Sequence, residues 1–324
     1  MPQMEESNPV PATQAKNSEM PQLSDYFPGH RPNGLQWPQS QILVAENHRL
    51  LFCPIAKNAC SSLKRLFVSI SDIKHKERIL AEDVHRSIDF FRTGIKLLDL
   101  DLDRATQLMA SAEYFKFAVV RDPFSRLLSA YLEKFVINRL KPGNQHHTGP
   151  VVAAAQNTAS PDFQRGITFA DFVRFVTAQE PEHLDPHWIP QTSYLRGVIY
   201  DRIYRMDQLP VLQRDLENRI GGKVALEHMN RSHSDRPRYV SGAARMLPDA
   251  LPAPKTIDRH SFMESEILYR IADYFASDYR LYYSDSSPDT EVSGAPVTNK
   301  QAGTGMSASL LRSMCQRVAR RFWR

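Results

Sequence analysis

A short apolar run at residues 115–120, Phe-Lys-Phe-Ala-Val-Val, most limits how this chain can fold. It ends at Arg121-Asp122-Pro123, and proline suits the first turn of a helix because no backbone donor is needed there. A run of this kind, with β-branched residues and a turn at its end, is typical of a buried strand. The pattern therefore predicts a strand that passes directly into a helix.

The same alternation recurs along the chain. Short apolar stretches predict strands at residues 41–44 and 50–55, and an extended stretch lies at 198–205. Apolar residues at helical spacing predict helices over 61–70, 123–140, 168–178, 209–220 and 263–277. Strands that alternate with helices indicate an α/β domain with a central, mostly parallel sheet flanked by helices, over residues 41–284.

Composition divides the rest of the chain. Residues 1–40 are rich in Pro, Gln and Ser and predict a disordered leader, while residues 285–308 predict a flexible linker. Residues 141–166 are rich in Pro, Gly, Asn and Ala, and we expect a long loop there that selects the acceptor of a reaction.

The net charge of +5 comes from the C-terminal tail. Residues 309–324 hold five arginines and no acid, and without them the basic and acidic residues balance, which gives no case for nucleic-acid binding. Apolar residues recur every four positions along the tail, so it predicts a basic amphipathic helix. We expect this helix to make peripheral contact with an anionic membrane. The alternative is that it packs on the domain or on a partner. With no signal peptide or membrane span in the sequence, we expect a cytoplasmic protein, peripheral on the inner face of the membrane.

Two strand-to-helix junctions carry residues suited to an anion. The first reads Lys57-Asn58-Ala59-Cys60-Ser61-Ser62 and offers a lysine, two hydroxyls and the unpaired N–H groups of a helix start. Alternatively, this junction is simply a capped helix with an exposed lysine. The junction is not a Walker A loop, because the glycines of that motif are missing.

The second junction places Arg121 at the end of a strand and Ser129 two turns along the next helix. The alternative here is that Asp122 pairs with Arg126 and that Arg121 is solvated. Parallel sheets bind ligands outside the carboxyl ends of their strands, so two such junctions together favour an anionic ligand.

These motifs resemble those of the carbohydrate sulfotransferases of the Golgi type, the group with the chondroitin and dermatan 4-O-sulfotransferases. AKNACSSLKRL (56–66) is similar to their 5′-phosphosulfate loop, and FKFAVVRDPFSRLLSAYLEKF (115–135) to their 3′-phosphate motif. Residues 185–191 with Tyr200-Asp201, and residues 279–283, resemble two later elements of the family.

The resemblance implies a P-loop-like sulfotransferase fold and a metal-free transfer of a sulfuryl group from 3′-phosphoadenosine 5′-phosphosulfate (PAPS) to a hydroxyl of a carbohydrate or glycolipid. Residues 57–62 would bind the 5′-phosphosulfate, Arg121 and Ser129 the 3′-phosphate, and Lys57 would also meet the leaving oxygen. A histidine would act as the base: His85 ranks first, with Glu82 and Asp83 expected to raise its basicity, and His187 second.

The missing membrane anchor favours a soluble bacterial relative. Two alternatives remain open: a nucleotide kinase, and a non-catalytic nucleotide- or glycan-binding protein at the membrane that retains the fold. No metal-ligand cluster is visible in the sequence.

Overall fold

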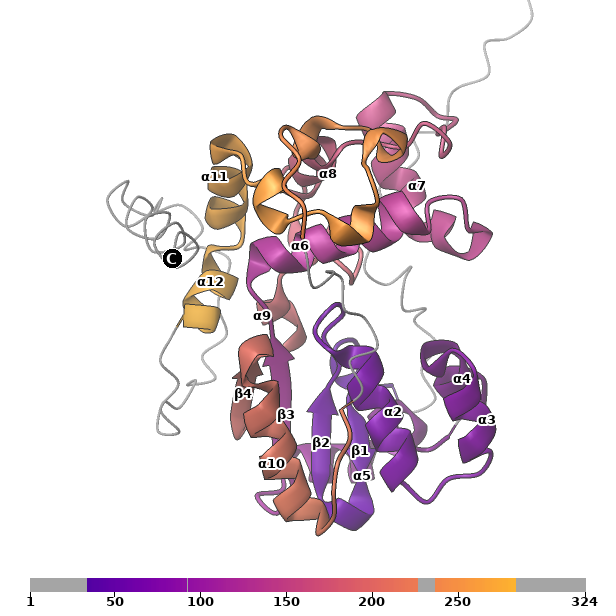
Figure 1. The fold of residues 1–324 in the computed structure, drawn as a ribbon. Helices are drawn as coiled ribbons and strands as arrows, with labels where there is room; N and C mark the ends of the chain where they lie inside the picture. Colours follow the sequence, from indigo (N-terminus) through magenta and orange to yellow (C-terminus); the bar gives the residue numbers. More distant parts are fainter. Residues whose placement is uncertain (1–33, 92, 227–236, 284–324) are drawn as a thin grey trace, which may run out of the picture.

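The computed structural model describes residues 34–91, 93–226 and 237–283. Its centre is a four-stranded sheet in the order β1 (Leu43–Ala45), β2 (Leu50–Cys53), β3 (Phe115–Val120) and β4 (Arg202–Arg205), shown in Figure 1. β1 pairs with β2 in the antiparallel sense, whereas β2, β3 and β4 run parallel. The predicted α/β fold with a mostly parallel sheet is confirmed.

Strand β3 is buried along its whole length. Phe117 and Val119 join the core cluster that also holds Phe67 of α2 and Leu212 of α10, whereas Ala118 and Val120 face the helices on the other side. Burial on both faces explains why this strand reads as a continuous apolar run and not as an alternating one.

The helices differ in detail from the prediction. They are α2 (Cys60–Ile70), α3 (Lys76–Ala81), α4 (Val84–Phe91), α5 (Leu102–Ala110), α6 (Pro123–Tyr131), α7 (Pro142–Gln156), α8 (Phe169–Val176), α9 (Gln191–Tyr194), α10 (Leu209–Ile220), α11 (Ser265–Tyr274) and α12 (Ala276–Tyr283). A π-helical segment, η4 (Leu132–Ile137), extends α6. Figure 1 shows α6, α7, α8 and α11 gathered beyond the end of the sheet to which β2 and β3 point.

The loop expected at 141–166 is wrong, because most of it is helix α7. Pro142 occupies the first turn, where a missing donor costs nothing, and Thr148, Val151 and Val152 are buried on one side. The amide of Asn144 donates to the carbonyl of Lys134 at 2.7 Å. Gly and Pro made the segment look irregular, but packing outweighs their weak helix propensity.

The packed part of the chain reaches upstream of residue 41. Trp37 lies edge-on to Tyr194, with ring centroids 4.9 Å apart, and Ser40 is buried. Residues 1–33 of the expected leader, the linker and the C-terminal helix lie outside the described residues. Within the described ranges, no helix is both long and apolar enough to cross a bilayer.

Arg126 ties α6 to two other backbone segments. Its side chain is buried, and its guanidinium donates to the carbonyls of Ala56 at 3.0 Å, Ile189 at 2.6 Å and Pro186 at 3.1 Å. The carboxylate of Asp122 instead accepts from the backbone of Ser125 at 2.8 Å, as the cap of α6. The alternative pairing of Asp122 with Arg126 is therefore wrong.

Replacing Arg126 by methionine should destabilise the fold strongly. Arg126→Met leaves three buried carbonyl groups without their donor, and we expect the free energy of unfolding to fall by about 3–5 kcal/mol. Arg174→Met is the matched control because Arg174 is exposed and forms a surface ion pair with Asp171, three residues away on the same helix. Urea denaturation of both variants measures the change in the free energy of unfolding. An equal loss in the two variants would contradict a stabilising role of the three buried hydrogen bonds.

Candidate active site

A cavity of about 850 Å³ lies where the two strand-to-helix junctions meet. The predicted residues that line it are Lys57, Ala59, Cys60, Ser61, Ser62, His85, Arg121, Ser129 and His187. The structure thus places both predicted anion-binding junctions and both candidate bases around one space. Arg121 also borders a second cavity of about 690 Å³, together with Arg259 and Tyr282.

The first junction is held in an unusual backbone conformation. Lys57 (φ 70°) and Ala59 (φ 56°) both adopt positive φ without being glycine. Such conformations cost about 1–3 kcal/mol each and persist where the surroundings impose them, often at functional sites. Helix α2 then begins at Cys60, and its N-cap residue, Ala59, has no side chain that could accept from the first N–H groups of the helix.

Asn58 departs from the expected role. Its side chain is fully buried and donates to the carbonyl of Val119 at 3.0 Å and to Oε1 of Gln191 at 2.6 Å. Gln191 in turn accepts from the backbone N–H of Arg121 and donates to its carbonyl, both at 2.9 Å. The Asn58 side chain therefore fastens the first junction to the second and does not line the cavity.

The same glutamine also anchors α12. The carboxylate of Asp278 on α12 accepts from the backbone N–H groups of Gln191 at 2.7 Å and of Thr192 at 3.0 Å. Asp278, which directly precedes residues 279–283, thus ties α12 to the 185–191 segment, and through Gln191 to the second junction.

Lys57 pairs with Glu133, a residue that the sequence analysis missed. Glu133 lies in the π-helical turn that follows α6, and π-helical turns often occur at functional sites. Burial alone would raise the pKa of Glu133, but the charge and hydrogen bond of Lys57 outweigh it and hold the pKa below its usual range. Burial also lowers the pKa of the half-buried Arg121 to about 10, so this guanidinium stays charged at neutral pH.

His85 at the start of α4 lies against the first junction. Its Nε2 is 2.7 Å from Oγ of Ser61, and its Nδ1 is 3.1 Å from Nζ of Lys64. Burial, followed by the charge of Lys64, lowers the pKa of His85 to about 3. The expectation that Glu82 and Asp83 raise its basicity is therefore wrong.

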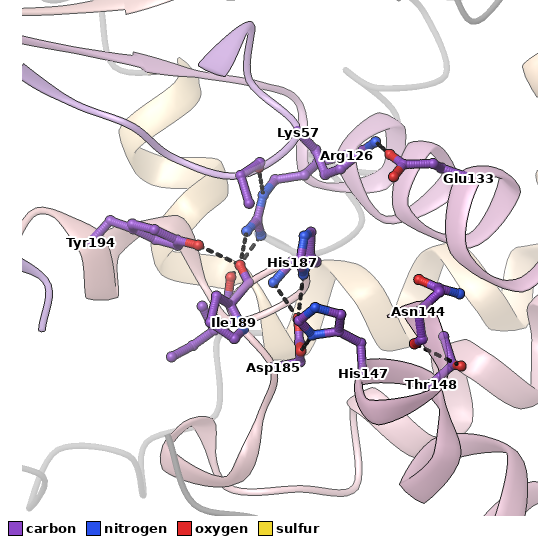
Figure 2. A network of polar contacts seen from close by, with 12 residues as sticks. Lys57, Arg126, Glu133, Asn144, His147, Thr148, Asp185, His187, Ile189 and Tyr194 are labelled. Atoms are coloured by element: carbon purple, nitrogen blue, oxygen red, sulfur yellow. Dashed lines mark hydrogen bonds and ion pairs between the residues drawn. The ribbon is translucent and has the colours of Figure 1, made fainter. Parts of the chain in front are cut away.

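His187 belongs to a second polar group that Figure 2 shows around Asp185. The fully buried carboxylate of Asp185 accepts from Nδ1 of His187 at 2.6 Å and from Nδ1 of His147, on α7, at 2.5 Å. Burial lowers the pKa of His187 to about 4, although Asp185 opposes the shift. The two histidines and the carboxylate could also hold a metal ion, a grouping that is invisible in the sequence because His147 lies in the segment expected to be a loop.

Comparison with known families decides the relationship. The family model described as "Sulfotransferase family" matches residues 40–284, which include both junctions and the closing helix. The chain belongs to the sulfotransferase family.

Three related proteins of this family illustrate the likeness. Carbohydrate sulfotransferase 14 of Mus musculus is 33% identical over 150 residues, covering 46% of this chain and 38% of the relative. Carbohydrate sulfotransferase 10 of Danio rerio is 31% identical over 161 residues (46% and 43%). Carbohydrate sulfotransferase 8 of Homo sapiens is 27% identical over 262 residues (76% and 54%).

The matched part of the chain spans about 40–55% of these sulfotransferases. All three come from vertebrates, so the expected bacterial origin finds no support among them. No solved structure matches the chain.

The lowered pKa values of His85 and His187 predict how the stability of the fold depends on pH. In the unfolded chain both take up protons near pH 6.5, whereas the folded chain resists this until about pH 3 for His85 and pH 4 for His187. The unfolded state therefore binds more protons between these limits, and the free energy of unfolding should fall by about 2–4 kcal/mol from pH 7 to pH 5.

Urea denaturation at several pH values measures this slope. The control is the double variant His85→Gln/His187→Gln, which should lose most of the dependence. Stability that is constant or rises toward pH 5 in the wild type would contradict the burial of neutral imidazoles.

Proposed function

We propose that this protein transfers the sulfuryl group of PAPS to a hydroxyl of a carbohydrate or glycoconjugate. One observation carries the proposal: the two junctions that resemble the 5′-phosphosulfate and 3′-phosphate motifs line a single cavity. A nucleotide with anionic groups at both ends needs two such sites at a fixed separation. The family match and the names of the carbohydrate sulfotransferases it resembles support the same reaction.

In this proposal the chain binds the donor through fixed positive groups. Lys57, the hydroxyls of Ser61 and Ser62 and the first N–H groups of α2 take the 5′-phosphosulfate, with the backbone of residues 58–60 around it. Arg121 and Ser129 take the 3′-phosphate. The second cavity beyond Arg121 offers space for the rest of the nucleotide, beside the ring of Tyr282.

PAPS supplies an activated sulfuryl group, and the chain's contribution is positioning and charge neutralisation, as in phosphoryl transfer. Lys57 is mostly buried, with 11% of its side chain exposed, and Glu133 holds it at the cavity wall. From there its ammonium can neutralise the charge that develops on the leaving oxygen. The positive charge at the site comes from Lys57, Arg121 and the start of α2. In this proposal these groups take the part that a metal ion could otherwise play.

In this proposal the acceptor enters the cavity beside η4 and α7. That part of the cavity is lined by Lys134 and Asn138 of η4 and its following turn, and by Gly143, His146 and His147 of α7. The segment expected to select the acceptor therefore reaches the cavity, as a helix and not as a loop. Polar and cationic side chains on these walls suit the hydroxyl-rich surface of a carbohydrate, of a polysaccharide or a glycolipid alike.

Calorimetry with adenosine 3′,5′-bisphosphate tests the donor site. Arg121→Ala and Lys57→Ala each remove a charge-assisted contact, and we expect affinity to fall about 10–100-fold. Glu133→Gln is the control in the same cavity: it removes a negative charge and should leave binding equal or tighter. Wild-type protein that does not bind this nucleotide would contradict the proposal.

Turnover separates the enzyme from the two alternatives. Labelled PAPS, incubated with a panel of unsulfated polysaccharides and glycosides, should label at least one of them. A nucleotide kinase would instead transfer phosphate from ATP with magnesium, and a non-catalytic binding protein would bind the nucleotide without turnover.

We also propose that residues 309–324 bring the enzyme to an anionic membrane surface from the cytoplasmic side. The support is the sequence pattern alone, with five arginines alongside an apolar stripe. Each arginine near such a surface contributes about 1 kcal/mol.

Truncation after residue 284 tests the tail. Binding to vesicles that contain phosphatidylserine should fall at least ~100-fold, because the basic residues are lost together. Activity on soluble acceptors should persist, and neutral phosphatidylcholine vesicles are the control. Equal binding by the full-length and truncated chains would contradict the membrane role.

A further inference from the structure

We propose that His187, oriented by Asp185, is the general base that accepts the proton of the acceptor hydroxyl, and that His85 instead orients the hydroxyl of Ser61. The inference rests on the proposed sulfuryl transfer and assigns a role to Asp185, which the motifs alone left without one. It follows from which imidazole nitrogen carries the proton.

A neutral imidazole has one N–H donor and one acceptor nitrogen, and the partner at one nitrogen sets the role of the other. A carboxylate can only accept. The 2.6 Å contact between Asp185 and Nδ1 of His187 therefore places the proton on Nδ1 and leaves a lone pair on Nε2. Within the described residues, no group hydrogen-bonds to Nε2 of His187, and this histidine lines the cavity.

His85 has the opposite arrangement. Burial lowers the pKa of Lys64, but in its ammonium form this lysine can only donate. The 3.1 Å contact with the ammonium then makes Nδ1 of His85 the acceptor and puts the proton on Nε2. That proton points to Oγ of Ser61 at 2.7 Å. Both nitrogens of His85 are thus engaged. Because the Ser61 oxygen accepts this bond, its own O–H remains available to donate to an anion at the start of α2.

Asp185 is built to hold an imidazole. Its carboxylate is fully buried and accepts three hydrogen bonds: from the backbone N–H of His187 at 2.8 Å and from the two imidazoles. These contacts hold the pKa of Asp185 well below its usual range in spite of burial, which alone would raise it. A fixed negative charge next to Nδ1 stabilises the imidazolium that forms when Nε2 takes a proton.

The charged groups around His187 set its basicity. Asp185 raises its pKa, whereas burial, Lys134 on η4 and His147 on α7 lower it. His187 in turn affects Glu133 and His85 through its charge.

The acceptor oxygen forms a bond to sulfur while its proton passes to Nε2 of His187. The bond between sulfur and the bridging oxygen breaks, and its electron pair leaves with the 5′-phosphate of adenosine 3′,5′-bisphosphate. The imidazolium of His187 then releases the proton to water, with Asp185 remaining a carboxylate throughout.

Nitrogen NMR of the full-length wild-type protein tests the assignment without an acceptor. Long-range ¹H–¹⁵N correlation spectra at pH 7 should show His187 as the Nδ1–H tautomer and His85 as the Nε2–H tautomer. The reverse tautomers would overturn the proposal. So would a metal ion that is retained through dialysis and released by EDTA with a change in the His147 and His187 signals, because a metal would then occupy this group.

Kinetics test the role itself. His187→Gln should lower kcat about 10²–10⁴-fold and leave the affinity for adenosine 3′,5′-bisphosphate within about twofold. His85→Gln should mainly raise the KM for PAPS and weaken nucleotide binding about tenfold, with a smaller loss of kcat. Asp185→Asn keeps only one acceptor oxygen for two imidazoles, so kcat should fall, and adding Asp185→Asn to His187→Gln should cost little more.

The opposite split, with kcat lost in His85→Gln and kept in His187→Gln, would overturn the assignment while leaving the sulfotransferase standing. A wild-type protein that binds the nucleotide but transfers the sulfuryl group to no acceptor, water included, would contradict the proposed function itself.

Discussion

The buried guanidinium of Arg126 is the contact on which the geometry of the cavity depends. It reaches from α6 to the backbone of the first junction at Ala56 and to that of the 185–191 segment at Pro186 and Ile189. Burial lowers its pKa, and the carbonyl oxygens around it offset the cost of keeping a charge inside the protein. Arg126 therefore fixes the backbone next to Lys57, on the first junction, and next to His187, within the 185–191 segment.

A second set of contacts joins the two ends of the donor site. Asn58 and Gln191 bind each other, and Gln191 binds both backbone groups of Arg121. The guanidinium of Arg121 also donates to the carbonyl of Lys57 at 3.3 Å, so Asn58, Gln191 and Arg121 together set the separation of the two junctions. Within the motifs, Asn58 and Arg126 are buried and fix the backbone, while neighbouring residues line the cavity.

The sequence predicted the parallel sheet and both junctions because their signals are local. Strand β3 is buried on both faces and therefore appears as an apolar run, and Pro123 marks the start of α6. Helix α7 was missed because its stability comes from packing and not from helix-forming residues. Asp185 and His147 are 38 residues apart, so their contact could not be found without α7. Glu133 was overlooked because the π-helical turn that brings it to Lys57 has no signal in the sequence.

The central claim is that one nucleotide bridges the two junctions, and a crystal structure of the full chain with adenosine 3′,5′-bisphosphate tests it most directly. We predict the 5′-phosphate at the start of α2, within hydrogen-bond distance of Lys57, Ser61 or Ser62, and the 3′-phosphate on Arg121 and Ser129. A nucleotide bound elsewhere, or one that contacts only a single junction, would contradict the account.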